Sequence, residues 1–450
     1  MTDSLNNPQR IECRLVMIDA HSMRILTTTA APRPLLPRES IAAYTRVAEA
    51  LNDAIEQRYG LRTMQLAFLP KAESQSYCAV HEIIALRKSV PRSLSLVELG
   101  EMAPGELSGE ERAIVLAIMK GQASGLGNFA RLGWIHDLLA KTGSYRDGGT
   151  MPAIRQLNQG IDFCLLSLTD TGGRKTWFKA VGEPNTREYA LTVELARRFP
   201  EYLPRMLATF PEWNGWLTEG VEGVPLNQSG DKTAWEQTLK ALAMMQRDSI
   251  ETKASLRAAG AKDWTCARLR LLSKPFFADV ERAMQAQTST KAMPLVGDEL
   301  ERLQKDVDAA LISQANSGIP ETLIHGDIGH GNIIMSPDGP VFLDWAETFI
   351  GQPFLCAEHL LADLERCRPE LSLERNSLRR SYASFWREYA SPETLADFIQ
   401  LAPAIAAFSY AVFAWEACAR QRDPTYVWPL IRSMMRRTRR ELEMRKEVAA

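Results

Sequence analysis

The sequence lacks several features that mark specialised classes of protein. Its seven cysteines are dispersed without a C-x-x-C pair, which is typical of reduced, mostly buried thiols and not of a disulfide framework. Its six histidines are also scattered, so the sequence shows no run of zinc ligands. The 53 Lys and Arg residues nearly balance 55 Asp and Glu residues. This balance argues against a dedicated nucleic-acid-binding protein, whose domain is normally strongly basic.

Long apolar segments are also missing. Met1–Arg10 is polar, so we expect no signal peptide. The longest apolar stretch, Leu401–Trp415, contains Pro403 and is shorter than the ~20 residues that span a bilayer. A basic run between Arg432 and Lys446 alternates with Met, Leu and Glu, as on a solvated helix face. We therefore expect a cytoplasmic protein that contacts neither membrane nor nucleic acid.

The chain has 450 residues, of which 45% are hydrophobic, a length that suggests about three globular units. Residues 1–105 alternate strand and helix signals and predict an α/β module with a structural or recognition role. It is compatible with a Nudix-like fold, without the Glu-rich metal-binding helix of that family. The elements expected in it are a hairpin of Arg14–Asp19 and Met23–Thr28, a helix over Ser40–Tyr59, and strands over Met64–Leu69 and Tyr77–Leu86.

The remaining chain divides into three parts. Residues 106–152 predict a helical linker, and residues 153–224 predict a small β-rich lobe. In that lobe Phe163–Leu168 and Thr176–Val181 form an expected hairpin, followed by a helix over Thr186–Phe199. Residues 225–450 predict a helical lobe that is interrupted by a mixed insert at 321–345. The expected fold class is therefore α+β.

The most informative segment is L-I-H-G-D-I-G-H-G-N-I-I-M-S-P-D-G-P-V-F-L-D-W, residues 323–345. Asp327 lies in a glycine-rich loop, Asn332 opens one short strand, and Asp344 ends the next. A tight hairpin would place Asn332 and Asp344 at the same end of the strands, beside the loop that carries Asp327. Two carboxylates and one amide oxygen suit Mg²⁺ that also binds nucleotide phosphates. The alternative is an Asx-rich turn that only joins two strands.

H-G-D-x-x-x-x-N followed by D-W resembles the signature of the aminoglycoside phosphotransferase/choline kinase-like superfamily, which is related to protein kinases. The resemblance implies a bilobal protein-kinase-like fold, with ATP and Mg²⁺ as cofactors. It implies that Asp327 is the catalytic base, that Asn332 and Asp344 hold Mg²⁺, and that His325 supports the loop. His330 receives no role. The family commonly carries an Asp after G-x-P that anchors the loop, and here Glu358 is the nearest acid.

The resemblance also implies a nucleotide-binding half upstream, where a strand Lys contacts phosphates and a helix Glu holds it. Lys179 lies on the strand Thr176–Val181, and Glu188 begins the following helix. Glu194 is the competing partner on the same helix. Lys175 is instead expected to be a solvated charge at the turn.

The resemblance implies two further nucleotide contacts. Backbone groups at Thr218, Glu219 and Gly220 are expected to bind the adenine edge. No complete G-x-G-x-x-G precedes Lys179, and Leu157–Asp162, with one glycine, is the candidate for the phosphate loop.

These features predict an ATP-dependent phosphotransferase that acts on a hydroxyl of a small molecule, of the aminoglycoside, sugar or amino-alcohol type. Acidic residues between 296 and 308 fit an amphipathic helix better than an aminoglycoside site. One alternative is a non-catalytic nucleotide-binding regulator that acts through its N-terminal domain, which could also bind a protein partner or form a homo-oligomer. A protein kinase is disfavoured because no D-F-G or A-P-E segment is present.

Overall fold

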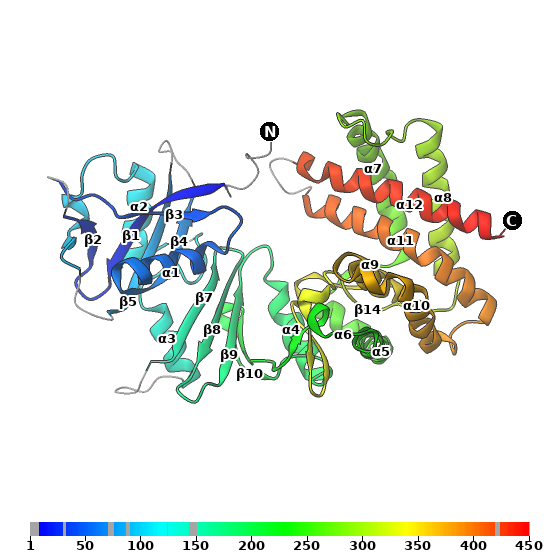
Figure 1. Ribbon diagram of the computed structural model, residues 1–450, viewed down its shortest axis with the longest axis horizontal. Coiled ribbons are helices and arrows are strands. Elements are labelled where there is room, and N and C mark those ends of the chain that lie inside the picture. The colour runs from blue at the N-terminus through cyan, green and yellow to red at the C-terminus, as the bar shows by residue number, and fades with distance from the viewer. Residues whose placement is uncertain are drawn as a thin grey trace. The chain divides into compact units, whose positions relative to one another are not determined.

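The computed structural model describes residues 9–29, 33–70, 76–86, 91–123, 125–143, 151–418 and 424–449. The chain forms two compact units (Figure 1). The first unit comprises Met1–Tyr189 and Arg205–Gly220, and the second comprises Ala190–Pro204 and Val221–Ala450. The chain therefore passes between the units three times.

The first unit begins with a six-stranded mixed sheet in the order β4-β5-β1-β2-β6, with β3 paired to β1. β1 and β2 pair antiparallel, with Met17 opposite Leu26, which confirms the predicted hairpin. β1 also pairs in parallel with β5. The elements are β1 (Arg10–Asp19), β2 (Arg24–Thr28), β3 (Arg38–Ala42), α1 (Val47–Tyr59), β4 (Leu61–Leu69), β5 (Tyr77–Leu86) and β6 (Leu94–Val97).

The helix predicted over Ser40–Tyr59 is wrong in its first turns. The helix begins at Val47, and the first three residues of the predicted range, 40–42, belong to β3 instead. Ile41 and Ala42 pair with Ile11 and Arg10 of β1. This long-range pairing overrides the local helical pattern, because propensity is only a weak prior against tertiary contacts.

A second, five-stranded antiparallel sheet follows in the order β10-β11-β9-β8-β7. The pairing of β8 with β9 confirms the predicted hairpin, whereas β7 was not predicted. The strands are β7 (Ala153–Gln159), β8 (Phe163–Thr169), β9 (Lys175–Val181), β10 (Met206–Phe210) and β11 (Gly215–Glu219), and α4 (Arg187–Arg198) follows β9.

One hydrophobic core joins the two sheets of the first unit. Val16 of the N-terminal sheet, Trp134 of α3 (Trp134–Thr142) and Phe178 of β9 belong to the same buried cluster. The helix α2 (Gly109–Met119) also contributes to it, through Val115. Residues 144–150 of the predicted linker lie outside the described residues. The division into 1–105, 106–152, 153–224 and 225–450 remains a prediction.

A buried polar network also links β7 to the N-terminal sheet. The side-chain amide of Gln156 accepts from the backbone N–H of Gln65 at 2.8 Å and donates to its carbonyl oxygen at 2.9 Å. Asn52 donates to the same Gln156 oxygen at 3.0 Å and accepts from Thr63 at 2.9 Å. Burial lowers the pKa of the adjoining His81 to about 3, so its ring is neutral. The N-terminal module is therefore tied to the strand that leads into the β7–β8 turn.

The second unit is mainly helical, and α7, α8, α11 and α12 pack together (Figure 1). Two three-stranded sheets, β12-β15-β16 and β13-β17-β14, accompany the helices. The β15–β16 hairpin confirms the predicted insert. The elements are β12 (Val224–Pro225), α5 (Lys232–Asp248), α6 (Lys253–Ala258), β13 (Lys262–Trp264), α7 (Cys266–Gln285), α8 (Asp298–Ala315), β14 (Thr322–His325), β15 (Ile333–Ser336), β16 (Gly339–Phe342), β17 (Thr348–Gly351), α9 (Phe354–Cys367), α10 (Arg375–Ala383), α11 (Pro392–Cys418) and α12 (Trp428–Ala449).

The apolar stretch at Leu401–Trp415 belongs to α11, which has 27 residues. Among the described residues, α11 is the one helix long and apolar enough to cross a membrane, so the expectation that this stretch is too short was wrong. However, 72% of its most apolar window is buried inside the protein. Such burial is typical of the central helix of a globular domain.

Candidate active site

The loop that carries Asp327 starts where β14 ends, at His325. Gly326 donates its backbone N–H to the carbonyl oxygen of Glu347 at 2.6 Å. A Cβ at Gly326 would collide with the ring of Phe349 and lie 2.8 Å from the Glu347 oxygen. Only glycine permits this close approach, and the next residue, Asp327, is exposed.

Asn332 fixes the orientation of Asp327. Its Nδ2 donates to the backbone oxygen of Asp327 at 2.9 Å and to Asp327 Oδ2 at 3.1 Å. Because Nδ2 faces Asp327, Oδ1 of Asn332 is the atom that could bind a cation. The structure thus brings together two of the three residues that the motif singled out.

Asp344 lies at the matching end of the hairpin. Leu343 donates its N–H to the carbonyl oxygen of Asn332 at 2.8 Å, so the residue before Asp344 is bonded to Asn332. Asp344 is exposed and has a left-handed backbone, with φ 61°. Asp and Asn tolerate this conformation better than other side chains do. The predicted placement of Asn332 and Asp344 at one end of the strands is confirmed in the backbone.

His325 links the loop to this end of the hairpin. Its buried ring lies 2.8 Å, through Nε2, from the carbonyl oxygen of Leu343, and its centroid lies 4.5 Å from that of Trp345. Burial lowers the pKa of His325, so a neutral ring donates from Nε2. These contacts are those of a structural support.

Sequence reasoning missed two residues of α9 that hold the loop. Cys356 is fully buried, and its Sγ accepts the backbone N–H of His325 at 3.1 Å. Burial raises the pKa of Cys356 to about 12, so the thiol stays protonated and contacts the carbonyl oxygen of His325 at 3.6 Å. Glu358, the acid nearest the expected anchor, instead pairs with Arg375 and Arg379.

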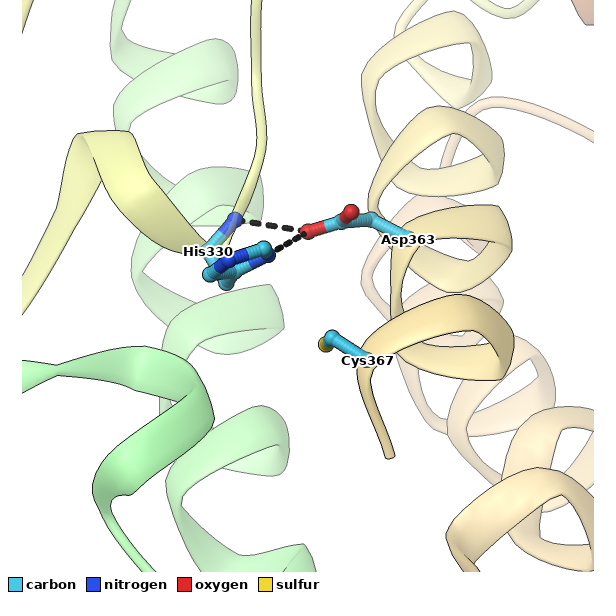
Figure 2. Close-up of side chains that lie close together, drawn as sticks. All are labelled: His330, Asp363 and Cys367. Atoms are coloured by element: carbon cyan, nitrogen blue, oxygen red, sulfur yellow. Dashed lines mark hydrogen bonds and ion pairs between the residues drawn. The ribbon is translucent and has the colours of Figure 1, made fainter. Parts of the chain in front are cut away.

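Asp363 is the second residue that was missed. Its Oδ2 accepts the backbone N–H of His330 at 2.7 Å and lies 2.8 Å from His330 Nδ1, as Figure 2 shows. Asp363 shares the buried face of α9 with Leu360 and Leu364. An acid among these buried leucines was a signal that the sequence offered, because buried carboxylates are normally paired.

In the first unit, the structure pairs Lys179 with Glu188 and not with Glu194. Lys179 Nζ lies 2.5 Å from Glu188 Oε1, and the two side chains are 16% and 3% exposed. Glu194 instead pairs with Arg197 and Arg198, and these bonds lower its pKa to about 2. The Lys179 ammonium also lies 5.9 Å from the ring centroid of Trp216.

Two backbone N–H groups in the segment predicted to bind adenine, at the end of β11, already donate hydrogen bonds within the protein. The N–H of Glu219 donates to the carbonyl oxygen of Arg205 at 2.9 Å, and the N–H of Gly220 donates to that of Lys175 at 2.8 Å. Adenine recognition at Thr218, Glu219 and Gly220 would therefore depend on carbonyl oxygens. Lys175, at the start of β9, is exposed as predicted, and its ammonium lies over Trp177.

Asp327, Asn332 and Asp344, all in the second unit, combine a group that can accept a proton with oxygen atoms that can bind a cation. With Oδ2 held by Asn332, Oδ1 of Asp327 is placed to accept a proton from a hydroxyl group. The donors available from Asn332 and Asp344 are oxygens, which Mg²⁺ prefers, and one or two carboxylates are its usual protein ligands. The residues therefore fit a magnesium–nucleotide site.

A family model matches the part of the chain that carries these residues. Residues 179–355 match the model of the phosphotransferase enzyme family. That segment spans Lys179, Glu188, Asp327, Asn332 and Asp344. No curated protein matches the chain significantly.

Several solved structures share a distant likeness with the chain. An ethanolamine kinase from Plasmodium vivax is 14% identical over 76% of this chain and 95% of its own, with a TM-score of 0.48. A macrolide 2'-phosphotransferase from Brachybacterium faecium is 17% identical over 66% and 98%, with a TM-score of 0.42. A choline kinase from Streptococcus pneumoniae is 14% identical over 69% and 99%, with a TM-score of 0.42.

Proposed function

Because residues 179–355 of this chain match the model of the phosphotransferase enzyme family, we propose that the protein transfers the γ-phosphoryl group of ATP to a hydroxyl of a small molecule. The observation that carries the proposal is the fixed carboxylate of Asp327, which Asn332 orients at one end of the hairpin that leads to Asp344. An Asx-rich turn that only joins two strands would not require the contacts with Glu347, with Asn332 and with α9 that hold this loop.

In the proposed reaction, Asp327 Oδ1 accepts the proton of the acceptor hydroxyl while the hydroxyl oxygen attacks the γ-phosphorus. The bond between the γ-phosphorus and the β,γ-bridging oxygen breaks, and ADP leaves. Asn332 keeps the carboxylate in place through its bond to Oδ2. Oδ1 of Asn332 and the carboxylate of Asp344 would hold Mg²⁺, which neutralises phosphate charge when bound. Catalysis of this kind comes from positioning and electrostatic stabilisation more than from covalent chemistry.

Lys179 is proposed to contact the α- and β-phosphates, with Glu188 as the counterion that holds it. The carbonyl groups of Thr218, Glu219 and Gly220 are proposed to face adenine, with Gly160 in the β7–β8 turn near the phosphates. The acceptor belongs to the aminoglycoside, sugar or amino-alcohol type, and the expected location is the cytoplasm. A protein partner or homo-oligomer through the N-terminal module remains a prediction.

The function is tested by measuring ADP release from Mg-ATP with a panel of aminoglycosides, sugars, amino alcohols and nucleosides. We expect one class to stimulate ADP release well above the hydrolysis seen without acceptor, with one phosphate added per acceptor by mass spectrometry. A thermal-shift screen with the same panel selects compounds for the assay. Mg-ATP binding without hydrolysis and without any acceptor would instead support the non-catalytic regulator.

Replacing Lys179 with Met is expected to lower kcat/KM for ATP by about 10²-fold or more, the scale of losing one preorganised charge contact. The change also removes the ammonium group that pairs with the buried Glu188, and breaking a fully buried ion pair costs about 3–5 kcal/mol. The double variant Lys179→Met/Glu188→Gln removes both charges and separates lost stability from lost activity. Lys175→Met, at the exposed end of the same strand, is the matched control. Normal kinetics in the stable double variant would refute the role of Lys179.

A further inference from the structure

A second group of metal-binding side chains lies beside the catalytic loop. A ring nitrogen of His330, a carboxylate oxygen of Asp363 and Sγ of Cys367 all lie within 4.8 Å of one another (Figure 2). Asp363 and Cys367 are four residues apart on α9, so they occupy one face of the helix. His330 follows Asp327 by three residues on the loop.

The donor set differs in kind from that of the proposed magnesium site. It combines an imidazole nitrogen, a carboxylate oxygen and a sulfur, whereas Mg²⁺ binds oxygen almost exclusively. Imidazole and thiolate are the usual protein ligands of Zn²⁺ and related transition-metal ions. Three protein ligands leave a fourth tetrahedral position for water or another ligand.

The present hydrogen bonds require only small adjustments for a metal to enter. His330 Nδ1 and Asp363 Oδ2 are 2.8 Å apart, whereas ligand atoms about 2.0–2.2 Å from a tetrahedral zinc are roughly 3.3–3.5 Å apart. The pair must therefore open by about half an ångström, with Cys367 moving inward. The backbone N–H of His330 also donates to Oδ2, at 2.7 Å.

Besides Arg368, whose charge also acts on Cys367, Arg366 opposes a cation here. Its Nη2 donates to Asp363 Oδ1 at 3.0 Å, but its side chain is 77% exposed, so solvent screens much of its charge. Bound to Oδ1, Arg366 also orients the carboxylate with Oδ2 toward His330, as outer-shell partners of metal ligands do.

We propose that His330, Asp363 and Cys367 bind a divalent transition-metal ion of the Zn²⁺ class, at a site separate from the magnesium ligands. The bound ion would replace the hydrogen bond between His330 and Asp363 with a metal bridge. Occupation of the site then adds metal ligation to the hydrogen bonds by which α9 already holds the loop that carries Asp327. The proposal does not depend on phosphoryl transfer, because it rests on the donor atoms alone.

Co²⁺ binding to the full-length protein, freed of any purification tag and held in excess Mg²⁺, tests the proposal. Thiolate ligation gives cobalt a near-ultraviolet charge-transfer band that oxygen ligands do not give. Of the seven cysteines, Cys367 alone is partly exposed and the other six are buried. We expect about one equivalent of Co²⁺ with this band, and displacement of the band by Zn²⁺.

Cys367→Ser is the decisive variant, because it leaves the bonds between His330 and Asp363 intact and should fold normally. We expect it to lose the band and to weaken Zn²⁺ binding at least about tenfold, the scale of disturbing a metal site. His21→Ala, a change at an exposed histidine elsewhere, and Asp344→Asn, at the magnesium site, should both keep the band. Absence of the band in the wild-type protein, or its persistence in Cys367→Ser, would overturn the assignment.

Discussion

Replacing Asp327 with Asn is expected to lower kcat by about 10²- to 10⁴-fold, the range that a positioned general base contributes. The amide is nearly isosteric, and its oxygen can still accept the bond from Asn332 Nδ2 that now reaches Asp327 Oδ2 at 3.1 Å. The loop should therefore keep its conformation while it loses its proton acceptor. Because Asp327 is exposed, the variant should unfold at nearly the wild-type temperature.

Steady-state kinetics with the acceptor found in the panel, together with the Kd of an ATP analogue, give the measurement. The Kd should change little, because the lost group is proposed to act on the acceptor hydroxyl and not on the nucleotide. Asp338→Asn removes an equally exposed carboxylate from the turn of the same hairpin and should leave kcat unchanged. If Asp327→Asn turned over at nearly the wild-type rate, Asp327 would not be the base.

The parts of the site that the sequence predicts are formed by residues that lie close together in the chain. Asn332 and Asp344 flank a tight hairpin, so the spacing of the strands and their turn places both residues at one end. Lys179 and Glu188 are nine residues apart on a strand and the helix that follows it. Local order alone brought them into reach, and the ion pair formed as expected.

The supports of the loop were not predictable by the same means. Cys356 and Asp363 contact residues 31 and 33 positions earlier in the chain, and only the packing of α9 beside β14 brings them there. In a sequence, a buried cysteine is interpreted as a small hydrophobic residue. The bonds of Cys356 to the backbone of His325 therefore could not be predicted. β3 was missed for a related reason, because its partner β1 is not the neighbouring strand in the chain.

The N-terminal module shows the same limit at the level of domains. Composition separated residues 1–105 from the small lobe, yet both share one core and the polar network of Gln156. The side-chain amide of Gln156 bonds both the backbone N–H and the backbone carbonyl oxygen of Gln65, as the backbone of a neighbouring strand would. Since β7 leads directly into the turn with Gly160, this module supports the strand before the candidate phosphate loop, whatever further partner it has.

Replacing Asp344 with Asn is expected to lower kcat by about 10²- to 10³-fold at ordinary Mg²⁺ concentrations, as loss of a preorganised charge in such a site does. Asn is the substitution that isolates the charge, because it accepts the left-handed backbone of this position at φ 61°. Ala or Val would add backbone strain and confuse stability with metal binding. Thermal unfolding of Asp344→Asn should therefore match that of the wild-type protein.

A Mg²⁺ titration then distinguishes the two carboxylates. If Asp344 binds Mg²⁺, its loss raises the Mg²⁺ concentration needed for half-maximal activity, and high Mg²⁺ restores part of the rate. If Asp327 accepts the proton, the defect of Asp327→Asn is the same at every Mg²⁺ concentration, because metal cannot replace a base. The opposite pattern, with Mg²⁺ rescuing Asp327→Asn and not Asp344→Asn, would exchange the two roles. If the activity defect of both variants were the same at every Mg²⁺ concentration, Asp344 would not be a Mg²⁺ ligand.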